Sequence, residues 1–102
     1  MNELFDKYPE MDAMFSEDLI IMNALKCASE RGRHIPDEFK AVGYDGTLIA
    51  KISYPSMTYV SQPIKELADT LVDVLLKKIN GAKLYEDIIL EDVCLVKGQT
   101  TE

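Results

Sequence analysis

The stretch KAVGYDGTLIA, residues 40–50, begins as an apolar strand and runs directly into an acid. Residues 41–44 suit a buried pleated strand, because most of them are apolar, β-branched or aromatic. Asp45 follows at once, beside Gly46. An Asp-Gly pair is good turn chemistry, so one interpretation of Asp45 is a turn residue. The other is a carboxylate that faces a ligand at the mouth of the strand.

Helix and strand patterns alternate on the N-terminal side of this stretch. A short helix is expected over 2–9, a brief strand over 12–15, and a second helix from residue 16 to a stop at Gly32. Residues 16–18 supply cap oxygens and negative charge at the start of that second helix, which is a structural interpretation of both Glu17 and Asp18.

The C-terminal side continues the alternation. Residues 47–53 form a short helical or irregular stretch, 57–61 a strand, and 63–80 the strongest helix of the chain. Two short strands, 87–90 and 93–98, follow, separated by Glu91 and Asp92. The long helix carries one apolar stripe, made of Ile64, Leu67, Ala68, Leu71, Leu75 and Ile79.

Alternation of this kind predicts an α/β fold with a mostly parallel sheet, arranged as a three-layer α/β/α structure. In such folds ligands bind outside the carboxyl ends of the strands. Polar side chains follow each of the first three strands, and they are Ser16, Glu17, Asp45, Ser61 and Gln62. This pattern indicates a polar rim that suits a small polyhydroxy or amide-rich ligand.

Composition limits the function further. The chain has 102 residues, room for one domain, and a net charge of −7, which argues against binding to a phosphate backbone. Cys27 and Cys94 have no CxxC partner, and His34 is the single histidine, so no metal site is expected and both cysteines are interpreted as buried thiols.

Several other classes of protein are disfavoured. The sequence has neither a membrane-length apolar run nor a charged-then-apolar leader, so a cytoplasmic protein without a membrane partner is expected. Catalytic and phosphate-binding motifs are absent, so neither an enzyme nor a cofactor is expected. Paired carboxylates for glycoside hydrolysis, from Glu17 and Asp45, are a weak alternative because acids are common in the chain.

Several motifs occur together, in order, over nearly the whole chain. They are Glu17-Asp18 at a helix start, Gly32 to Pro36, Val42-Gly43-Tyr44-Asp45, Pro55 to Val60, Gln62 before the long helix, and Leu95 to Thr101. Their order and spacing resemble the effector-binding core of the lactose-repressor (LacI/GalR) family of bacterial transcription regulators. The resemblance implies a periplasmic-binding-protein-like fold of two lobes, with a sugar or sugar phosphate bound between them.

The resemblance also implies how this chain is divided. Residues 1–102 would be a C-terminal fragment of the core, with about 10–61 and 92–100 in the C-terminal lobe. Residues 62–91 would belong to a first lobe that the chain lacks. Members of the family are dimers or tetramers, and operator DNA would be bound only through an N-terminal domain that is also missing.

Residue roles follow from the same resemblance. The effector-binding positions of the family fall on Glu17, Asp45 and Gln62, which favours ligand contact for Asp45. Glu17 stands where the family often has Asn, and Gly46 where a second Asp is frequent, so the identity of the effector stays open.

Part of the subunit interface of the family falls on Met22, Ile49 and Ile52. Burial of the two isoleucines within the monomer is the alternative.

The function expected is therefore the effector-sensing and dimerisation region of a repressor, for a carbohydrate-utilisation operon. One alternative is a fragment of a sugar-binding uptake protein with the same architecture. Another is a phospho-receiver with Asp45 as the phosphate acceptor. That chemistry needs an acidic cluster and a strand-end lysine, which Glu17, Asp18 and Lys97 match only loosely.

Overall fold

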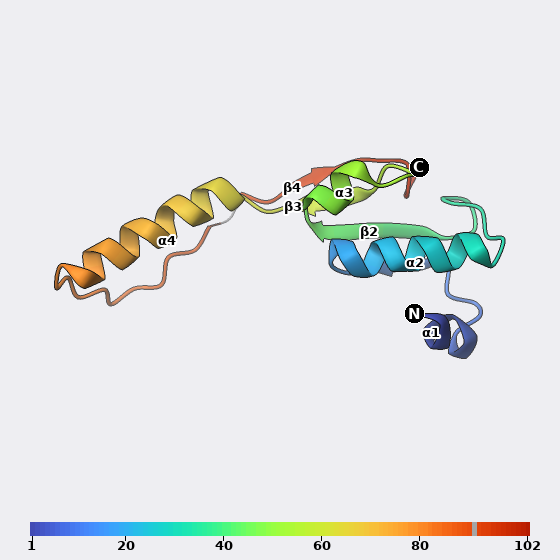
Figure 1. Ribbon diagram of the computed structural model, residues 1–102, viewed down its shortest axis with the longest axis horizontal. Helices are drawn as coiled ribbons and strands as arrows, with labels where there is room; N and C mark the ends of the chain where they lie inside the picture. Colours follow the sequence, from blue (N-terminus) through green and yellow to red (C-terminus); the bar gives the residue numbers. More distant parts are fainter. Residues whose placement is uncertain (91) are drawn as a thin grey trace. The chain divides into compact units, whose positions relative to one another are not determined.

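The structure is a computed structural model that describes residues 1–90 and 92–102, so Glu91, expected between the last two strands, lies outside the described residues. The elements in chain order are α1 (Asn2–Lys7), β1 (Ala13–Phe15), α2 (Asp18–Glu30), β2 (Lys40–Asp45), α3 (Leu48–Ile52), β3 (Thr58–Ser61), α4 (Ile64–Ile79) and β4 (Cys94–Val96) (Figure 1). The chain divides into two compact units, Met1–Ser61 with Cys94–Glu102, and Gln62–Val93.

The first unit is built on a sheet with the strand order β1-β2-β3-β4. β1, β2 and β3 are parallel, and β4 runs antiparallel to β3, so the predicted α/β fold with a mostly parallel sheet is confirmed. The register pairs Phe15 with Val42 and Asp45 with Ser61. Because the three parallel strands point the same way, the residues that follow them gather at one end of the sheet.

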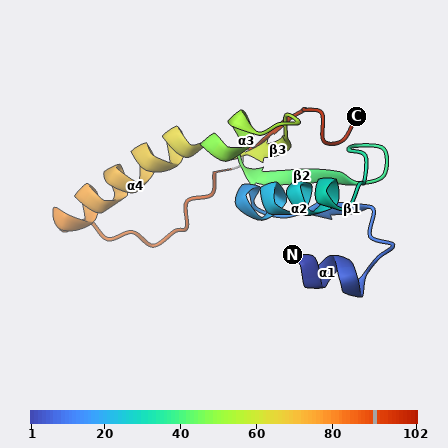
Figure 2. The ribbon, with the colours of Figure 1, turned by 45° about the vertical axis from the view of Figure 1, so that its right-hand side comes forward.

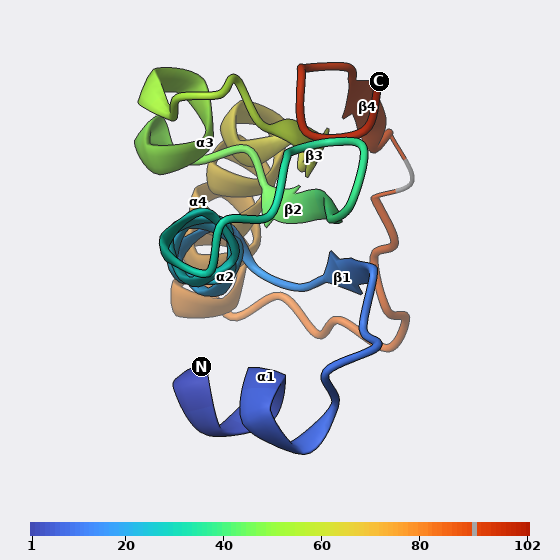
Figure 3. The same ribbon diagram turned by 90° about the vertical axis from the view of Figure 1, so that its right-hand side faces the viewer.

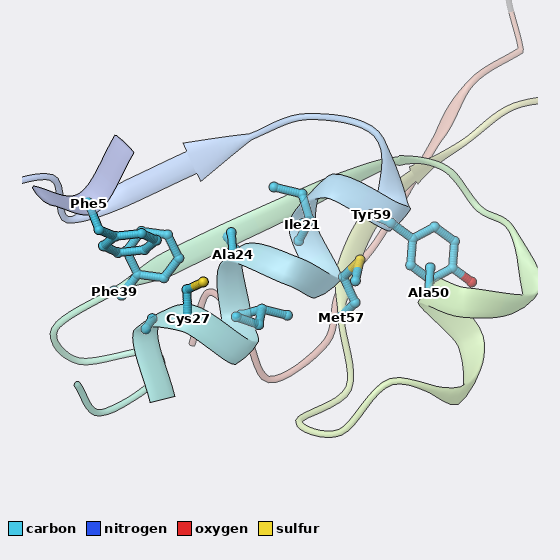
Figure 4. Close-up of a cluster of buried hydrophobic side chains, with 11 residues drawn as sticks. Phe5, Ile21, Ala24, Cys27, Phe39, Ala50, Met57 and Tyr59 are labelled. Atoms are coloured by element: carbon cyan, nitrogen blue, oxygen red, sulfur yellow. The ribbon is translucent and has the colours of Figure 1, made fainter. Parts of the chain in front are cut away.

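Helices α2 and α3 lie on the same face of this sheet (Figure 3). The apolar side of α2, with Ile21, Ala24 and Ala28 at helical spacing, is fully buried against it. Figure 4 shows the resulting core, with Phe5 and Phe39 at one end and Tyr59 and Ala50 at the other. The rings of Phe5 and Phe39 are tilted, with centroids 5.3 Å apart. This packing fixes α2 over β2.

The opposite face of the sheet is apolar and open in the described residues of this unit. Phe15 is 63% exposed and Leu95 56%, and Phe15 meets Tyr44 edge-on at a centroid distance of 6.0 Å. The second helical layer of the expected α/β/α arrangement is therefore not supplied by the described residues of this unit.

The C-terminal residues of the unit bind back to the two central strands. The buried Thr100 hydroxyl donates to the Ala41 carbonyl oxygen at 2.6 Å and accepts from the Thr58 N–H at 2.9 Å. The Ala41 N–H also donates to the Thr100 carbonyl oxygen, at 3.0 Å. These bonds satisfy buried backbone groups where β2 and β3 begin.

The second unit consists of α4 and the segment that follows, which returns along the helix in both views (Figures 1 and 2). The helix ends as predicted, with Asn80 as C-cap and Gly81 at a φ of 85°. No residue of α4 is buried, and its apolar stripe remains exposed, with Leu71 60% and Ile79 70% accessible.

Two predictions about the C-terminal third are wrong. Residues 87–90 do not form a strand, because no described strand of their unit pairs with them, and an unpaired strand leaves its backbone groups without partners. Cys27 is a buried thiol as expected, but Cys94 is exposed. The reason for the second error is that Cys94 lies on β4, an edge strand whose three residues are all exposed.

Replacing Thr100 by Val should lower the free energy of unfolding by about 2–4 kcal/mol, because two buried backbone groups lose their partner. Urea unfolding of the protein measures this loss. Thr101→Val is the matched control, since among the described residues its half-buried hydroxyl meets the Thr58 hydroxyl, at 2.8 Å, and no buried backbone group, and it should cost about 1 kcal/mol. Equal losses in the two variants would contradict this account of the tail.

Candidate functional site

The candidate site lies where the three parallel strands end. Asp45 is the last residue of β2 and pairs with Ser61, the last residue of β3. The start of α2 follows β1 closely, so Glu17 and Asp18 reach the same end of the sheet. The topology thus brings together side chains that are far apart in the sequence, as the alternation of elements predicts.

Asp45 adopts an unusual backbone conformation, with a φ of 116°. This region is favourable for glycine and costs other residues roughly 1–3 kcal/mol. Gly46 follows with a φ of 73°, so two successive residues turn the chain sharply as it leaves β2. The turn predicted at Asp45 is therefore present, and the acid occupies its strained first position.

Asp18 binds Thr47, the residue that follows this turn. Its side chain is 2% exposed, and its Oδ2 accepts hydrogen bonds from the Thr47 N–H at 2.7 Å and from the Thr47 hydroxyl at 2.8 Å. Its Oδ1 is buried without a hydrogen-bond partner. The predicted capping role for Asp18 is thus wrong, because its carboxylate reaches across to the start of α3 while still placing negative charge in the first turn of α2.

Glycines leave the space that this arrangement needs. A Cβ on Gly43 would lie 2.4 Å from Asp18 Oδ1, and a Cβ on Gly46 would lie 2.9 Å from the Ser61 hydroxyl oxygen. Larger side chains at either position would displace the buried carboxylate or the turn. The contact between Asp18 and Thr47 was missed in the sequence, where 29 positions separate them and only the two glycines hint at close approach.

The other predicted effector residues are placed as follows. Glu17 is exposed and is the N-cap of α2 without a side-chain capping bond, so the predicted capping by its side chain is wrong. Gln62 is half-buried and begins the second unit. The first unit alone therefore brings together two of the three predicted side chains, Glu17 and Asp45.

Among the residues predicted for a subunit interface, Met22 and Ile49 are half-buried, and Met22 packs on the core. Ile52 is 68% exposed, so burial within the described part of the monomer does not account for it.

The chemistry available here is hydrogen bonding by carboxylates and hydroxyls. An ionised carboxylate accepts through two oxygens and can bind two neighbouring hydroxyl groups of one ligand in a charge-assisted way. Within the described residues, no group of three or more His, Cys, Asp or Glu side chains could hold a metal ion. Among the same residues, no helix is both long and apolar enough to cross a bilayer.

The sequence over residues 3–101 matches the family described as a periplasmic binding protein-like domain. The chain belongs to this family. The match spans the elements from β1 to β4, and together with the relatives below it confirms the resemblance to the effector-binding core of LacI-type regulators.

Individual relatives are transcription regulators. The sucrose operon repressor of Streptococcus mutans is 42% identical over 90 residues, which are 87% of this chain and 28% of that repressor. The solved complex of the regulator CelR with cellobiose superposes with a TM-score of 0.88 at 29% identity, over 97% of this chain and 31% of CelR. The lac repressor dimer bound to operator and the anti-inducer ONPF superposes with a TM-score of 0.84 at 28% identity, over 97% of this chain and 35% of the repressor chain.

This periplasmic-binding-protein-like chain therefore spans about a third of the length of the relatives it matches. The relatives are regulators and not enzymes, in line with the absence of catalytic motifs in the sequence.

Replacing Asp45 by Gly should raise the free energy of unfolding by about 1 kcal/mol, because glycine adopts the observed φ without strain. Asp45→Ala should lower the free energy of unfolding, since alanine tolerates this backbone conformation less well than Asp. Urea unfolding distinguishes the three proteins. Asp12→Gly is the control, at an exposed acid without a positive φ, and should give no gain.

Proposed function

We propose that this chain is the C-terminal part of the effector-binding core of a LacI-type repressor of a carbohydrate-utilisation operon. The effector is a sugar or sugar phosphate, and its binding alters the affinity of the full-length protein for operator DNA. DNA contact is made by an N-terminal domain outside this chain. The protein acts in the cytoplasm, is not an enzyme and uses no cofactor.

One observation carries this proposal. Asp45 is kept in a strained conformation at the carboxyl end of a parallel strand, where a plain turn would place Gly or Asn at lower cost. Strain that is maintained by surrounding hydrogen bonds is typical of functional positions. The family relation supports a sugar in particular, because CelR carries cellobiose and the related repressor controls a sucrose operon.

Glu17 and Gln62 complete the proposed effector contacts. Glu17 presents acceptors only, where an Asn would also donate, so it selects a ligand that donates hydroxyl protons at that point. Gln62 opens the unit that we assign to the other lobe of the core. The exposed apolar stripe of α4 supports that assignment, because a face of this kind needs further structure to cover it.

Titration calorimetry of the full-length protein with sucrose, cellobiose, ribose and their phosphates tests the proposal. One of these sugars should bind the wild type, and Asp45→Ala should weaken it about 100-fold or more, because two charge-assisted hydrogen bonds are lost. Asp12→Ala, at an exposed acid before β1, is the control and should bind normally. Equal affinity in wild type and Asp45→Ala would show that Asp45 serves only the turn.

We also propose that the protein forms a homodimer or higher oligomer through Met22, Ile49 and Ile52. Ile52 and its neighbour on α3, Leu48, are 68% and 69% exposed, which is unusual for two apolar residues on one short helix. The lac repressor, which shares this fold, is described as a dimer on its operator. These observations support an interface that includes α3.

Ile52→Asp should convert the full-length protein to monomer in analytical ultracentrifugation, because a buried unpaired charge opposes association. Tyr54→Asp is the control, since Tyr54 is 94% exposed in the loop after α3 and outside the proposed interface. An unchanged oligomer in the Ile52 variant would place the interface elsewhere.

A further inference from the structure

We propose that Asp18 is a positioning residue of the effector site. Through its hydrogen bonds to Thr47, Asp18 holds Asp45 in the conformation that presents the Asp45 carboxylate to the sugar. This inference rests on the proposed function, and it assigns a role in binding to an acid whose side chain is buried away from any ligand.

First, Asp18 is buried and forms hydrogen bonds with Thr47. The side chain is 2% exposed, so solvent and ligand do not reach it. One oxygen, Oδ2, accepts both hydrogen bonds from Thr47, at 2.7 and 2.8 Å. Burying a carboxylate with its second oxygen unpartnered is costly, and the first turn of α2, where Asp18 lies, offsets part of this cost with its positive dipole end.

Second, Asp45 and Thr47 are both held in place and lie only two positions apart in the chain. Asp45 is fixed on one side by its pairing with Ser61 in the sheet. Thr47 is fixed on the other side by Asp18, so Gly46 is the single residue between the anchors. The chain meets both only by taking the positive φ angles seen at Asp45 and Gly46. Without Asp18, Asp45 would relax toward an ordinary conformation and its carboxylate would turn away.

Third, Asp18 lies at the start of α2. Glu17, the other proposed ligand contact in this unit, is its immediate neighbour in the chain. The bonds from Asp18 to Thr47 therefore fix the start of α2 and the turn after β2 as one body. A single buried acid therefore sets the spacing between the exposed Glu17 and the half-buried Asp45, the two groups of this unit that we assign to the effector.

The test uses the full-length protein with two readouts. Hydrogen exchange followed by mass spectrometry reports the amides of residues 45–52, and calorimetry reports affinity for the sugar that binds the wild type. Asp18→Ala should speed exchange in this peptide and weaken binding about tenfold or more. Thr47→Val loses only the hydroxyl bond and should show a smaller change in both, whereas Thr47→Ser retains both bonds and should match the wild type.

Positioning through Thr47 predicts that adding Thr47→Val to Asp18→Ala weakens binding no further. Phe39→Leu is the control for general destabilisation, since this core residue lies just before β2, away from its carboxyl end. It should lower the melting temperature and leave the affinity unchanged. If Asp18→Ala does not fold, Thr47→Val, at an exposed residue, decides the question.

The outcomes separate this inference from the proposed function. Wild-type affinity in Asp18→Ala, or wild-type exchange over residues 45–52, would overturn the role of Asp18 while leaving sugar binding intact. If no sugar in the panel binds the wild type, the proposed function fails. In that case unchanged exchange in Asp18→Ala overturns the conformational role of Asp18, and faster exchange supports it.

Discussion

Two hydrogen bonds from Thr47 to one buried oxygen of Asp18 connect the start of α2 to the start of α3. Strand pairing in the sheet does not make this connection. The parallel strands bring their ends together, but strand pairing stops at Asp45 and Ser61. Beyond that point the chain is held by the contact between Asp18 and Thr47. This contact needs the space left by Gly43 and fixes the start of α3, and in our proposal it also maintains the conformation of Asp45. The side chains proposed to bind the effector, which solvent reaches at least in part, are thus supported by Asp18, which is buried.

The sequence predicts much of the fold because most of the chain follows local rules. The helical spacing of Ile21, Ala24 and Ala28 and the stop at Gly81 appear in the structure as expected. Asp45 was recognised as both a turn residue and a strand-end acid. The bond from Asp18 to Thr47 could not be predicted, since capping offers a carboxylate at a helix start a nearer set of partners. Residues 87–90 failed as a strand because strand formation depends on a partner, not on local sequence.

The two units differ in how many of their own apolar side chains they bury. The first unit has a closed core on the α2 side of its sheet, while the opposite side exposes Phe15 and Leu95. The second unit buries nothing from α4. In the proposed effector-binding core, these exposed faces are where the rest of the protein would pack. Burial within the described residues is therefore concentrated on the α2 side of the sheet.

The bonds made by Thr100 have a consequence for the order of folding. Ala41, in β2, obtains a hydrogen-bond partner from a residue 59 positions later in the chain. During synthesis on the ribosome, β1, β2 and α2 emerge well before that partner does. The hydrogen bonds at the start of β2 thus stay incomplete until Thr100 has left the exit tunnel, and contacts of such long range slow folding. A nascent chain that stalls before this point would present open strand ends, which chaperones are suited to protect.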